Sequence, residues 1–435
     1  MKAVNVGILG LGTVGCGTAR VLQDNAAEIS RRLGRDVRVA AVCSRSAEKA
    51  REIAPDAAFT SDPFELVSRD DVDIVVELFG GTDIAKDAVL KALENGKHVV
   101  TANKKLLAEY GNEVFALAEQ KNVMVNFEAA VAGGIPIIKA LREGLAANNI
   151  RSIAGIINGT SNFILSEMRE KGSAFADVLK EAQALGYAEA DPTFDIEGHD
   201  AGHKITIMSS LAFGTPVNFQ ACYLEGISKL ESRDIKYAEE LGYRIKLLGI
   251  TRKTDKGIEL RVHPTLIPES RLIANVNGVM NAVRVQADMV GETLYYGPGA
   301  GSLPTASAVV ADIVDISRLI GADAENRVPY LAFQAEQVKE MAILPMDEIT
   351  SSYYLRVQVD DKTGVLGQIA NLLAEQGVSI EALIQKGVID GGQAEIVILT
   401  HSTVEKQVKA AIAGIEALDA VDGKVVMIRM ESLYG

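Results

Sequence analysis

The chain has 435 residues, more than one ordinary domain holds, so we expect two or three domains. Its formal net charge of −14 argues against a nucleic-acid-binding surface, because neutralising phosphates takes clustered lysine and arginine. The three cysteines lie far apart and lack CxxC spacing, which indicates a reducing compartment and argues against a disulfide framework or structural zinc.

The segment MKAVNVGILGLGTVG contains an apolar run that could be mistaken for a signal peptide. Glycines stand where the hydrophobic region of a signal peptide would continue, so the run is better interpreted as a first strand. No stretch approaches the ~20 uncharged apolar residues that span a membrane. We therefore expect a soluble, cytoplasmic protein that does not insert into membranes.

Residues 1–130 alternate short β-branched runs with helix-like segments. This alternation predicts βαβ units around a parallel sheet, as in a Rossmann-type doubly wound α/β domain. The predicted strands are VNVGILG, VRVAAVC, DIVVELF, KHVVTAN and NVMVNFE.

The first predicted strand leads into GLGTVG, a GxGxxG loop that opens a helix. In this position the glycines permit a tight turn, close approach of the pyrophosphate of a dinucleotide, and helix–strand packing. The helix N-terminus adds free backbone N–H groups for the phosphates. The candidate cofactor-binding residues of the loop are Gly10, Leu11, Gly12, Thr13, Val14 and Gly15.

The second predicted strand bears on the choice of coenzyme. Selectivity for NAD usually needs a carboxylate at the end of this strand, but Asp36 precedes the strand instead. The strand exit offers Arg45 between two serines, a combination that suits a 2′-phosphate. We expect NADP(H) to be preferred and NAD(H) to be possible, the alternative being that Arg45 is a solvated loop residue.

The pattern of the sequence changes at residue 131, and residues 131–320 are predicted to form a second, α+β domain. GGIPIIKALREGLAANNI predicts a connecting helix, and IELRVHPTLIP and NAVRVQADMVGETLYY predict an antiparallel sheet. A helix near residues 303–320 is expected to pack back on the first domain. Residues 321–350 have weak periodicity and predict a linker, and residues 351–435 predict a compact βαββα unit.

The stretch from Gly186 to Gly214 concentrates acidic residues ahead of an apolar helix. His199 and His203 have the i,i+4 spacing of zinc helices, but neighbouring glycines weaken the helix start and no third ligand follows. The N-terminus of a helix, where a carboxylate is favourable, explains Asp200 but not the other charged residues of the stretch.

An acid/base site also explains Lys204. This lysine stands at the start of an apolar helix, where a charged side chain needs a partner of opposite charge. On a helix Asp200 and Lys204 share one face, so the carboxylate can hold the ammonium. Such an ammonium can protonate a carbonyl oxygen that receives a hydride. Thr101 and Lys104 follow a predicted strand at the edge where doubly wound sheets bind ligands, and a converging Lys104 would lower the pKa of Lys204.

Together these segments closely resemble homoserine dehydrogenase over nearly the whole chain. The resemblance implies reversible oxidation of L-homoserine to L-aspartate 4-semialdehyde with NAD(P), on the route to threonine, methionine and isoleucine. The matching blocks are GLGTVG, ELFGG, VTANK, EAAVAGGIPII, GIINGTSNFIL, GYAEADPTFDIEGHDAGHK and YGPGAGSLPTASAVVADI.

The resemblance assigns roles to individual residues. Lys204 becomes the proton donor and acceptor, Lys104 its partner on the cofactor side, and Asp195 and Asp200 the carboxylates that support substrate and lysine. Glu189 is implied to bind the substrate's amino group. The loop blocks add Gly159 and Thr160 for the substrate and Gly301 for the cofactor, each with a structural turn as its alternative. Gly80 of the ELFGG block is a further cofactor candidate.

Members of this family also bind a monovalent cation, usually sodium, through main-chain carbonyl oxygens. The resemblance places that site at Glu128, Val131, Gly133 and Ile135. It further implies that residues 131–320 carry the catalytic and dimerisation functions.

The segment YYLRVQVDDKTGVLGQIANLLAEQGVSI resembles an ACT domain, which implies a ferredoxin-like regulatory unit over residues 351–435. Such domains pair edge to edge and often bind amino acids, so threonine is the expected effector and a homodimer or homotetramer the expected assembly. Two alternatives stay open: another Rossmann enzyme acting on an amino-acid aldehyde or oxo acid, and an inactive amino-acid sensor.

Overall fold

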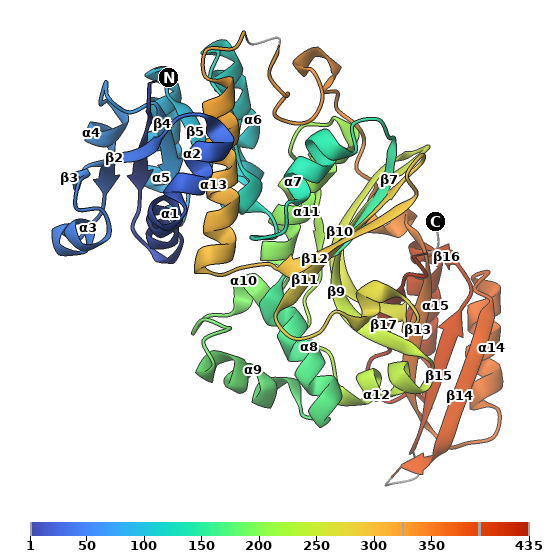
Figure 1. The fold of residues 1–435 in the computed structure, drawn as a ribbon. Helices are drawn as coiled ribbons and strands as arrows, with labels where there is room; N and C mark the ends of the chain where they lie inside the picture. Colours follow the sequence, from blue (N-terminus) through green and yellow to red (C-terminus); the bar gives the residue numbers. More distant parts are fainter. Residues whose placement is uncertain (1, 324–325, 390–392, 434–435) are drawn as a thin grey trace. The chain divides into compact units, whose positions relative to one another are not determined.

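The structure, a computed structural model (Figure 1), describes residues 2–323, 326–389 and 393–433, with the side chains of 386–389 left out. The chain forms two compact units, which we describe separately. Unit 1 comprises Met1–Gly159, Asp200–Cys222 and Val279–Met341, and unit 2 comprises Thr160–His199, Tyr223–Gly278 and Ala342–Gly435.

Unit 1 contains a six-stranded sheet in the order β3-β2-β1-β4-β5-β6, and all neighbouring strands in it are parallel. The predicted Rossmann-type domain is therefore confirmed. Its strands are β1 (Val4–Leu9), β2 (Val37–Cys43), β3 (Ala58–Thr60), β4 (Ile74–Glu77), β5 (His98–Thr101) and β6 (Val125–Asn126). Its helices are α1 (Thr13–Asp24), α2 (Ala26–Leu33), α3 (Ala47–Ile53), α4 (Pro63–Val67), α5 (Asp83–Glu94) and α6 (Lys104–Gln120).

A helix from much later in the chain, α13 (Ser302–Leu319), lies beside α1 in this domain (Figure 1). Val309 and Ile313 belong to the same apolar core as Ala19 of α1 and the strand residues Val6 and Ile8. A Cβ atom at Gly17 would lie 2.7 Å from the carbonyl oxygen of Ser302, so only glycine permits this close approach.

Unit 1 also contains an antiparallel sheet in the order β12-β11-β7 and the buried helix α11. The connecting helix predicted over residues 133–150 is shorter than expected. α7 (Ile137–Lys139) passes into a π-helical turn (Ala140–Gly144), in which the N–H of Leu145 donates to the carbonyl of Ala140. The elements are η1 (Glu128–Ala130), β7 (Ile150–Ile156), α11 (His199–Phe213), η3 (Phe219–Ala221), β11 (Met280–Ala287), β12 (Glu292–Pro298) and η6 (Ala335–Gln337).

Unit 2 is built on strands in the order β9-β10-β17-β13-β15-β14. Its strands are β8 (Tyr223–Leu224), β9 (Tyr243–Thr254), β10 (Gly257–Pro268), β13 (Thr350–Asp360), β14 (Ile380–Ile389), β15 (Gln393–Thr400), β16 (Thr403–Val404) and β17 (Val426–Met430). Its helices are α8 (Gly159–Lys171), α9 (Phe175–Ala184), α10 (Thr193–Ile196), α12 (Ser232–Glu240), η4 (Leu272–Asn275), η7 (Met346–Glu348), α14 (Val365–Glu375) and α15 (Glu405–Glu416).

The C-terminal part of unit 2 is βαββαβ rather than the predicted βαββα, because the additional strand β17 follows α15. β17 pairs antiparallel with β13 and parallel with β10, so it has a strand on each side. Alternation along β13 turns Leu355 and Val357 into the core under α14 and α15. It turns Arg356 to the opposite face, where the guanidinium binds both oxygens of Asp234 on α12, at 2.6 and 3.0 Å.

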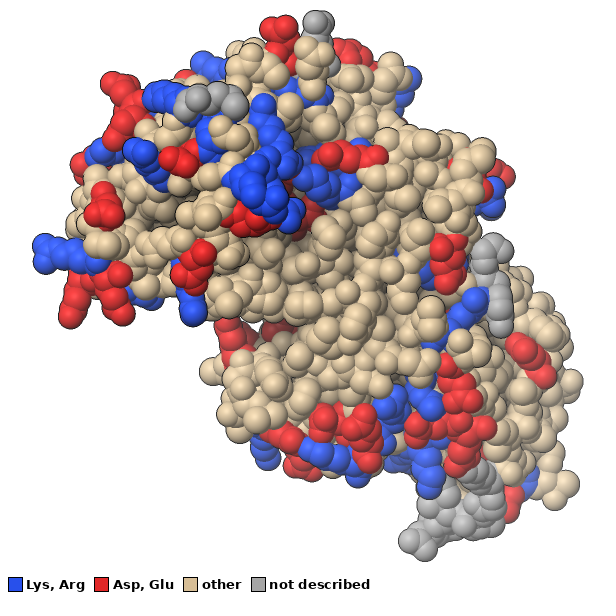
Figure 2. Space-filling model, in the orientation of Figure 1, with Lys and Arg blue, Asp and Glu red and all other residues tan. Residues whose placement is uncertain are grey.

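Basic and acidic side chains lie next to one another on the face drawn in Figure 2. Among the helices in the described residues, none is both long enough and apolar enough to cross a membrane.

Candidate active site

The glycine loop after β1 gives each of its three glycines a different role. Gly10 has φ +98°, a left-handed conformation that L side chains rarely adopt. A Cβ at Gly15 would lie 1.9 Å from the carbonyl oxygen of Gly10, so the helix packs on the turn only because this residue is glycine. Nothing lies within 4 Å of a Cβ built on Gly12, which leaves the N-terminus of α1 open to a phosphate group.

The exit of β2 presents Arg45, which is exposed. The two flanking serines serve the backbone here: Ser44 Oγ accepts the N–H of Ser46, and Ser46 Oγ caps α3 by accepting the N–H of Lys49. Asp36 precedes β2 at the other end of the strand and accepts a hydrogen bond from Ser30. Arg45 is thus the ionisable side chain that this exit offers to a ligand.

Glu77, which sequence reasoning did not single out, ends β4 and is fully buried. Its carboxyl group accepts from the hydroxyl of Thr101 at 2.6 Å and from the N–H of Phe79 at 2.8 Å. Asn103 donates to the carbonyl of Gly81 at 2.7 Å and caps α6 by accepting the N–H of Leu106. Glu77 thereby joins the loops after β4 and β5, the second of which ends at Lys104.

Burial raises the pKa of Glu77 to about 7, against the opposing effect of its hydrogen bonds to Thr101, Phe79 and Asn103. The folded protein therefore holds a proton that the unfolded chain releases near pH 4.5, and stability falls as the pH rises from there towards about 7. We expect Glu77→Gln to remove this dependence, which amounts to about 3 kcal/mol. Unfolding of both proteins by urea at pH 5.5 and 7.5 samples about 2 kcal/mol of this change, and a pH-independent difference between the two proteins would contradict the prediction.

Lys104 is the first residue of α6, directly after the cap residue Asn103. Its Nζ lies 2.5 Å from Oδ1 of Asp200, the second residue of α11. The end of strand β5 and the start of helix α11, about a hundred residues apart in the sequence, thus meet within unit 1.

A second lysine, Lys204, binds the other carboxylate oxygen of Asp200. Lys204 Nζ donates to Asp200 Oδ2 at 2.7 Å and to the carbonyl of Ile157 at 2.7 Å, and the amide of Asn158 donates to the same Oδ2 at 2.9 Å. The Asp200 and Lys204 side chains are only 3% and 10% exposed. Burial alone would raise the pKa of Asp200, but the two lysines hold it far below its usual range, so Asp200 stays ionised.

This arrangement places two ammonium groups on one buried carboxylate and leaves the cluster with an excess positive charge. Such a cluster can attract a developing oxyanion and give it a proton. The sequence predicted the pairing of Asp200 and Lys204. The contact between the Asn158 amide and this carboxylate was not predicted.

Three of the remaining substrate candidates, Glu189, Asp195 and Thr160, belong to unit 2. Glu189 is exposed, and Asp195 lies in the first turn of α10, where its carbonyl accepts from Ser161. The hydroxyl of Thr160 donates to the carbonyl of Tyr187 at 2.6 Å. Gly159 belongs to unit 1, where a Cβ would lie 2.8 Å from the carbonyl oxygen of Val279, so the turn itself requires a glycine.

The two histidines of the stretch contact aromatic rings. His199 stacks on Phe194 within unit 2, with ring centroids 6.3 Å apart. His203 is buried in unit 1 and meets the ring of Phe219 edge-on, with centroids 4.2 Å apart.

The loop after β6 is strained, with φ of 56° at Ala132 and 50° at Gly133. A Cβ at Gly133 would lie 2.4 Å from the carbonyl oxygen of Gly299, so the two loops touch through their backbones. The buried carboxylate of Glu128 accepts the N–H groups of Ile138 and Lys139. A backbone turned in this way can direct carbonyl oxygens at a hard monovalent cation.

Gly80 and Gly301 lie in loops of unit 1. A Cβ at Gly80 would meet nothing within 4 Å, so that loop is open on this side. Gly301 is the N-cap of α13 and has φ +128°, which favours glycine.

Models of three protein families match the chain: "Homoserine dehydrogenase, NAD binding domain" over residues 10–128, "Homoserine dehydrogenase" over residues 136–314, and "ACT domain" over residues 353–420. The homoserine dehydrogenase of Neisseria gonorrhoeae is 80% identical over 434 residues, and the alignment covers 100% of both chains. The chain belongs to the homoserine dehydrogenase family. It is an oxidoreductase with an NAD-binding domain and an ACT domain, which confirms the resemblance seen in its sequence.

Other homoserine dehydrogenases show the same relation. That of Pseudomonas aeruginosa is 58% identical with full coverage of both chains. The crystal structure of a homoserine dehydrogenase from Thiobacillus denitrificans superposes with a TM-score of 0.96 at 62% identity, covering 100% of this chain and 99% of that one. A hyperthermophilic archaeal homoserine dehydrogenase in complex with NADPH has a TM-score of 0.62 at 30% identity, covering 73% of this chain and 98% of that one.

Proposed function

We propose that the protein interconverts L-homoserine and L-aspartate 4-semialdehyde, with Lys204 as the group that moves the proton, in threonine, methionine and isoleucine biosynthesis. The observation that carries the proposal is the buried carboxylate of Asp200 held between Lys204 and Lys104. Both lysines stand in unit 1 together with the glycine loop, so one compact unit combines a dinucleotide site with a proton donor.

The coenzyme, when bound, supplies or accepts the hydride. In the direction of homoserine, the Lys204 ammonium gives its proton to the aldehyde oxygen as negative charge develops there. In the reverse direction the neutral amine accepts the proton of the alcohol. Asp200 holds the Nζ of Lys204 in place, and Lys104 adds positive charge close by on the other carboxylate oxygen.

The amino-acid part of the substrate needs groups of opposite charge. We assign its ammonium to Glu189 and Asp195, carboxylates of the 186–204 stretch, and place donors for its carboxylate in the turn at Gly159 and Thr160. This substrate assignment rests on the family resemblance together with the charge of the groups.

The decisive assay is oxidation of NADPH with L-aspartate 4-semialdehyde, run beside glutamate 5-semialdehyde and pyruvate. We expect turnover with the four-carbon amino aldehyde and little with the other two. Faster turnover of an oxo acid or of the longer aldehyde would favour another Rossmann enzyme, and no turnover with any of them would favour a sensor.

NADP(H) is the proposed coenzyme, with NAD(H) as a weaker substitute, because Arg45 stands exposed at the exit of β2. Arg45→Ala should raise the KM for NADPH at least about tenfold and leave that for NADH nearly unchanged, since only NADPH carries the 2′-phosphate. Initial rates with each coenzyme measure this. Arg51→Ala, an exposed arginine on α3, is the control, and equal effects on both coenzymes would remove Arg45 from the site.

Three further assignments complete the proposal. The carbonyl oxygens of Glu128, Val131, Gly133 and Ile135 bind a sodium ion, an assignment supported by the strained backbone at Ala132 and Gly133. The ACT domain binds threonine as an end-product effector. The protein works in the cytoplasm as a homodimer or homotetramer.

A further inference from the structure

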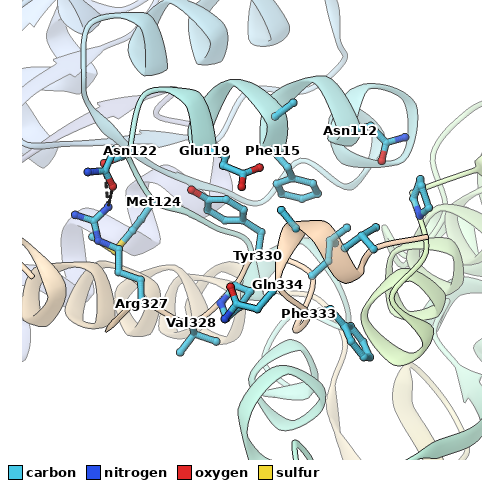
Figure 3. Close-up of a pocket in the computed structure, with 16 residues that line it drawn as sticks. Asn112, Phe115, Glu119, Asn122, Met124, Arg327, Val328, Tyr330, Phe333 and Gln334 are labelled. Atoms are coloured by element: carbon cyan, nitrogen blue, oxygen red, sulfur yellow. Dashed lines mark hydrogen bonds between the residues drawn. The ribbon is translucent and has the colours of Figure 1, made fainter. Parts of the chain in front are cut away.

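A cavity of about 430 Å³ lies in unit 1 beside the C-terminal half of α6 (Figure 3). Its size falls within the range of about 300–1,000 Å³ that small-molecule sites occupy. None of the residues assigned above to coenzyme, substrate or cation lines it. It is therefore a separate feature that the proposed reaction does not use.

One wall of the cavity is a single stripe of α6. Asn112, Phe115, Ala116 and Glu119 line it at i, i+3, i+4 and i+7, the spacing of one helix face. Residues 327–338, which the sequence predicted to be part of a linker, form the facing wall.

The floor of the cavity is aromatic and fixed in position. The ring of Tyr330 stacks on that of Phe115, with centroids 5.7 Å apart and an interplanar angle of 11°. The Tyr330 hydroxyl donates to the carbonyl of Val123 at 2.5 Å. Met124 is buried at the same place, and Val328 and Phe333 stay 38% and 37% exposed at the rim. The cavity thus offers an open apolar surface to a ligand.

Two opposite charges border this apolar floor. Burial raises the pKa of Tyr330 to about 12, Arg327 opposes the rise and Glu119 adds to it, so both charges act on the same hydroxyl. Arg327 is held by the carbonyls of Asn122 and Ala322, at 2.9 and 3.0 Å. Within residues 2–323, 326–389 and 393–433, neither Arg327 nor Glu119 forms an ion pair, and the buried Nε of Arg327 has no hydrogen-bond partner.

We propose that this cavity binds a free α-amino acid with an apolar side chain. The side chain lies against Phe115 and Tyr330, the carboxylate faces Arg327 and the ammonium faces Glu119. A zwitterion matches the pair of opposite charges, whereas a simple anion or cation would match only one of them.

The test needs a signal from the cavity itself, because an amino acid also suits the substrate site. Met124 provides it: with methyl-¹³C methionine, its resonance is assigned by the variant Met124→Leu and then followed while L-phenylalanine or L-leucine is added to the full-length protein. We expect a saturable shift with half-saturation in about the millimolar range. Phenylalaninamide and 3-phenylpropanoate, which each lack one charge, should bind at least about tenfold more weakly.

Two variants locate the binding. Ala116→Phe fills the cavity and should abolish the Met124 shift, while Gln120→Phe, at an exposed position of the same helix outside the lining, should preserve it. Glu119→Gln, at an exposed position, should weaken binding of the amino acid at least about tenfold and leave that of 3-phenylpropanoate unchanged.

Three results would overturn the proposal. The first is no Met124 shift at 20 mM probe, a concentration about tenfold above the expected half-saturation. The others are equal binding of the amino acid, phenylalaninamide and 3-phenylpropanoate, or an undiminished shift in Ala116→Phe. A shift that depends on protein concentration without any probe would assign the cavity to a second copy of the chain instead. Each outcome is independent of whether the enzyme reduces aspartate semialdehyde.

Discussion

Lys204→Ala should lower the turnover of aspartate semialdehyde at least about 100-fold, the lower end of what general acid catalysis contributes. The variant removes the ammonium that Asp200 and the carbonyl of Ile157 hold in a side-chain site only 10% exposed. Water can replace the proton donor but cannot be held as firmly in place. Steady-state kcat with NADPH measures the loss, and the KM for NADPH should change little because the glycine loop is untouched.

Lys105→Ala provides the matched control. Lys105 follows Lys104 on α6 and is 44% exposed, so its loss removes the same charge from the protein without touching Asp200. We expect near-wild-type turnover in this control. Comparable losses in the two variants, or full activity of Lys204→Ala, would remove Lys204 from the mechanism.

Asp200→Asn should be the second severe change, because it leaves two lysines facing an uncharged group in a buried place. Leaving a buried charge without its partner costs about 3–5 kcal/mol, and losing one preorganised group of an active site costs about 100-fold in turnover. Each ammonium would also lose its proton more readily. The pH–rate profile of homoserine oxidation should therefore move to lower pH, which a general loss of structure would not cause.

Asp191→Asn is the comparison for this variant. Asp191 is exposed and accepts hydrogen bonds from the nearby Thr193, so we expect small effects on stability and rate. Urea unfolding and the pH dependence of kcat should be measured for both. An unshifted pH profile in Asp200→Asn, with normal turnover, would contradict the role given to the carboxylate.

Much of the fold follows from local patterns in the sequence. The parallel sheet of unit 1 shows in the β-branched runs, because strands buried on both faces need continuous apolar sequence. The helix predicted from residues 133–150 was only partly right, because helical structure is confined to Ile137–Lys139 and the π-helical turn Ala140–Gly144. The strand β17 was missed because its two neighbours, β10 and β13, are distant in sequence and leave no local signal.

The candidate site could be predicted where it depends on spacing within one element. Asp200 and Lys204 are four residues apart on one helix, and that alone predicts their contact. Glu77 could not be found in this way, because its partners Thr101 and Asn103 come from the next strand and loop. The cavity beside α6 could not be predicted either, since Phe115 meets Tyr330 only through the folded chain.

The position of β17 has a consequence for the order in which the protein folds. β8 pairs with β10 at Arg261 and Val262, but the partners of Thr265 and Leu266 in β17 are synthesised only with residues 426–430, roughly 160 residues after β10 itself. Until then β10 lacks these partners, and Arg261 lacks the carboxylate of Glu431, which it binds at 2.6 Å. Until β17 is in place, unit 2 therefore exposes this part of the β10 edge, and an unpaired strand edge favours aggregation.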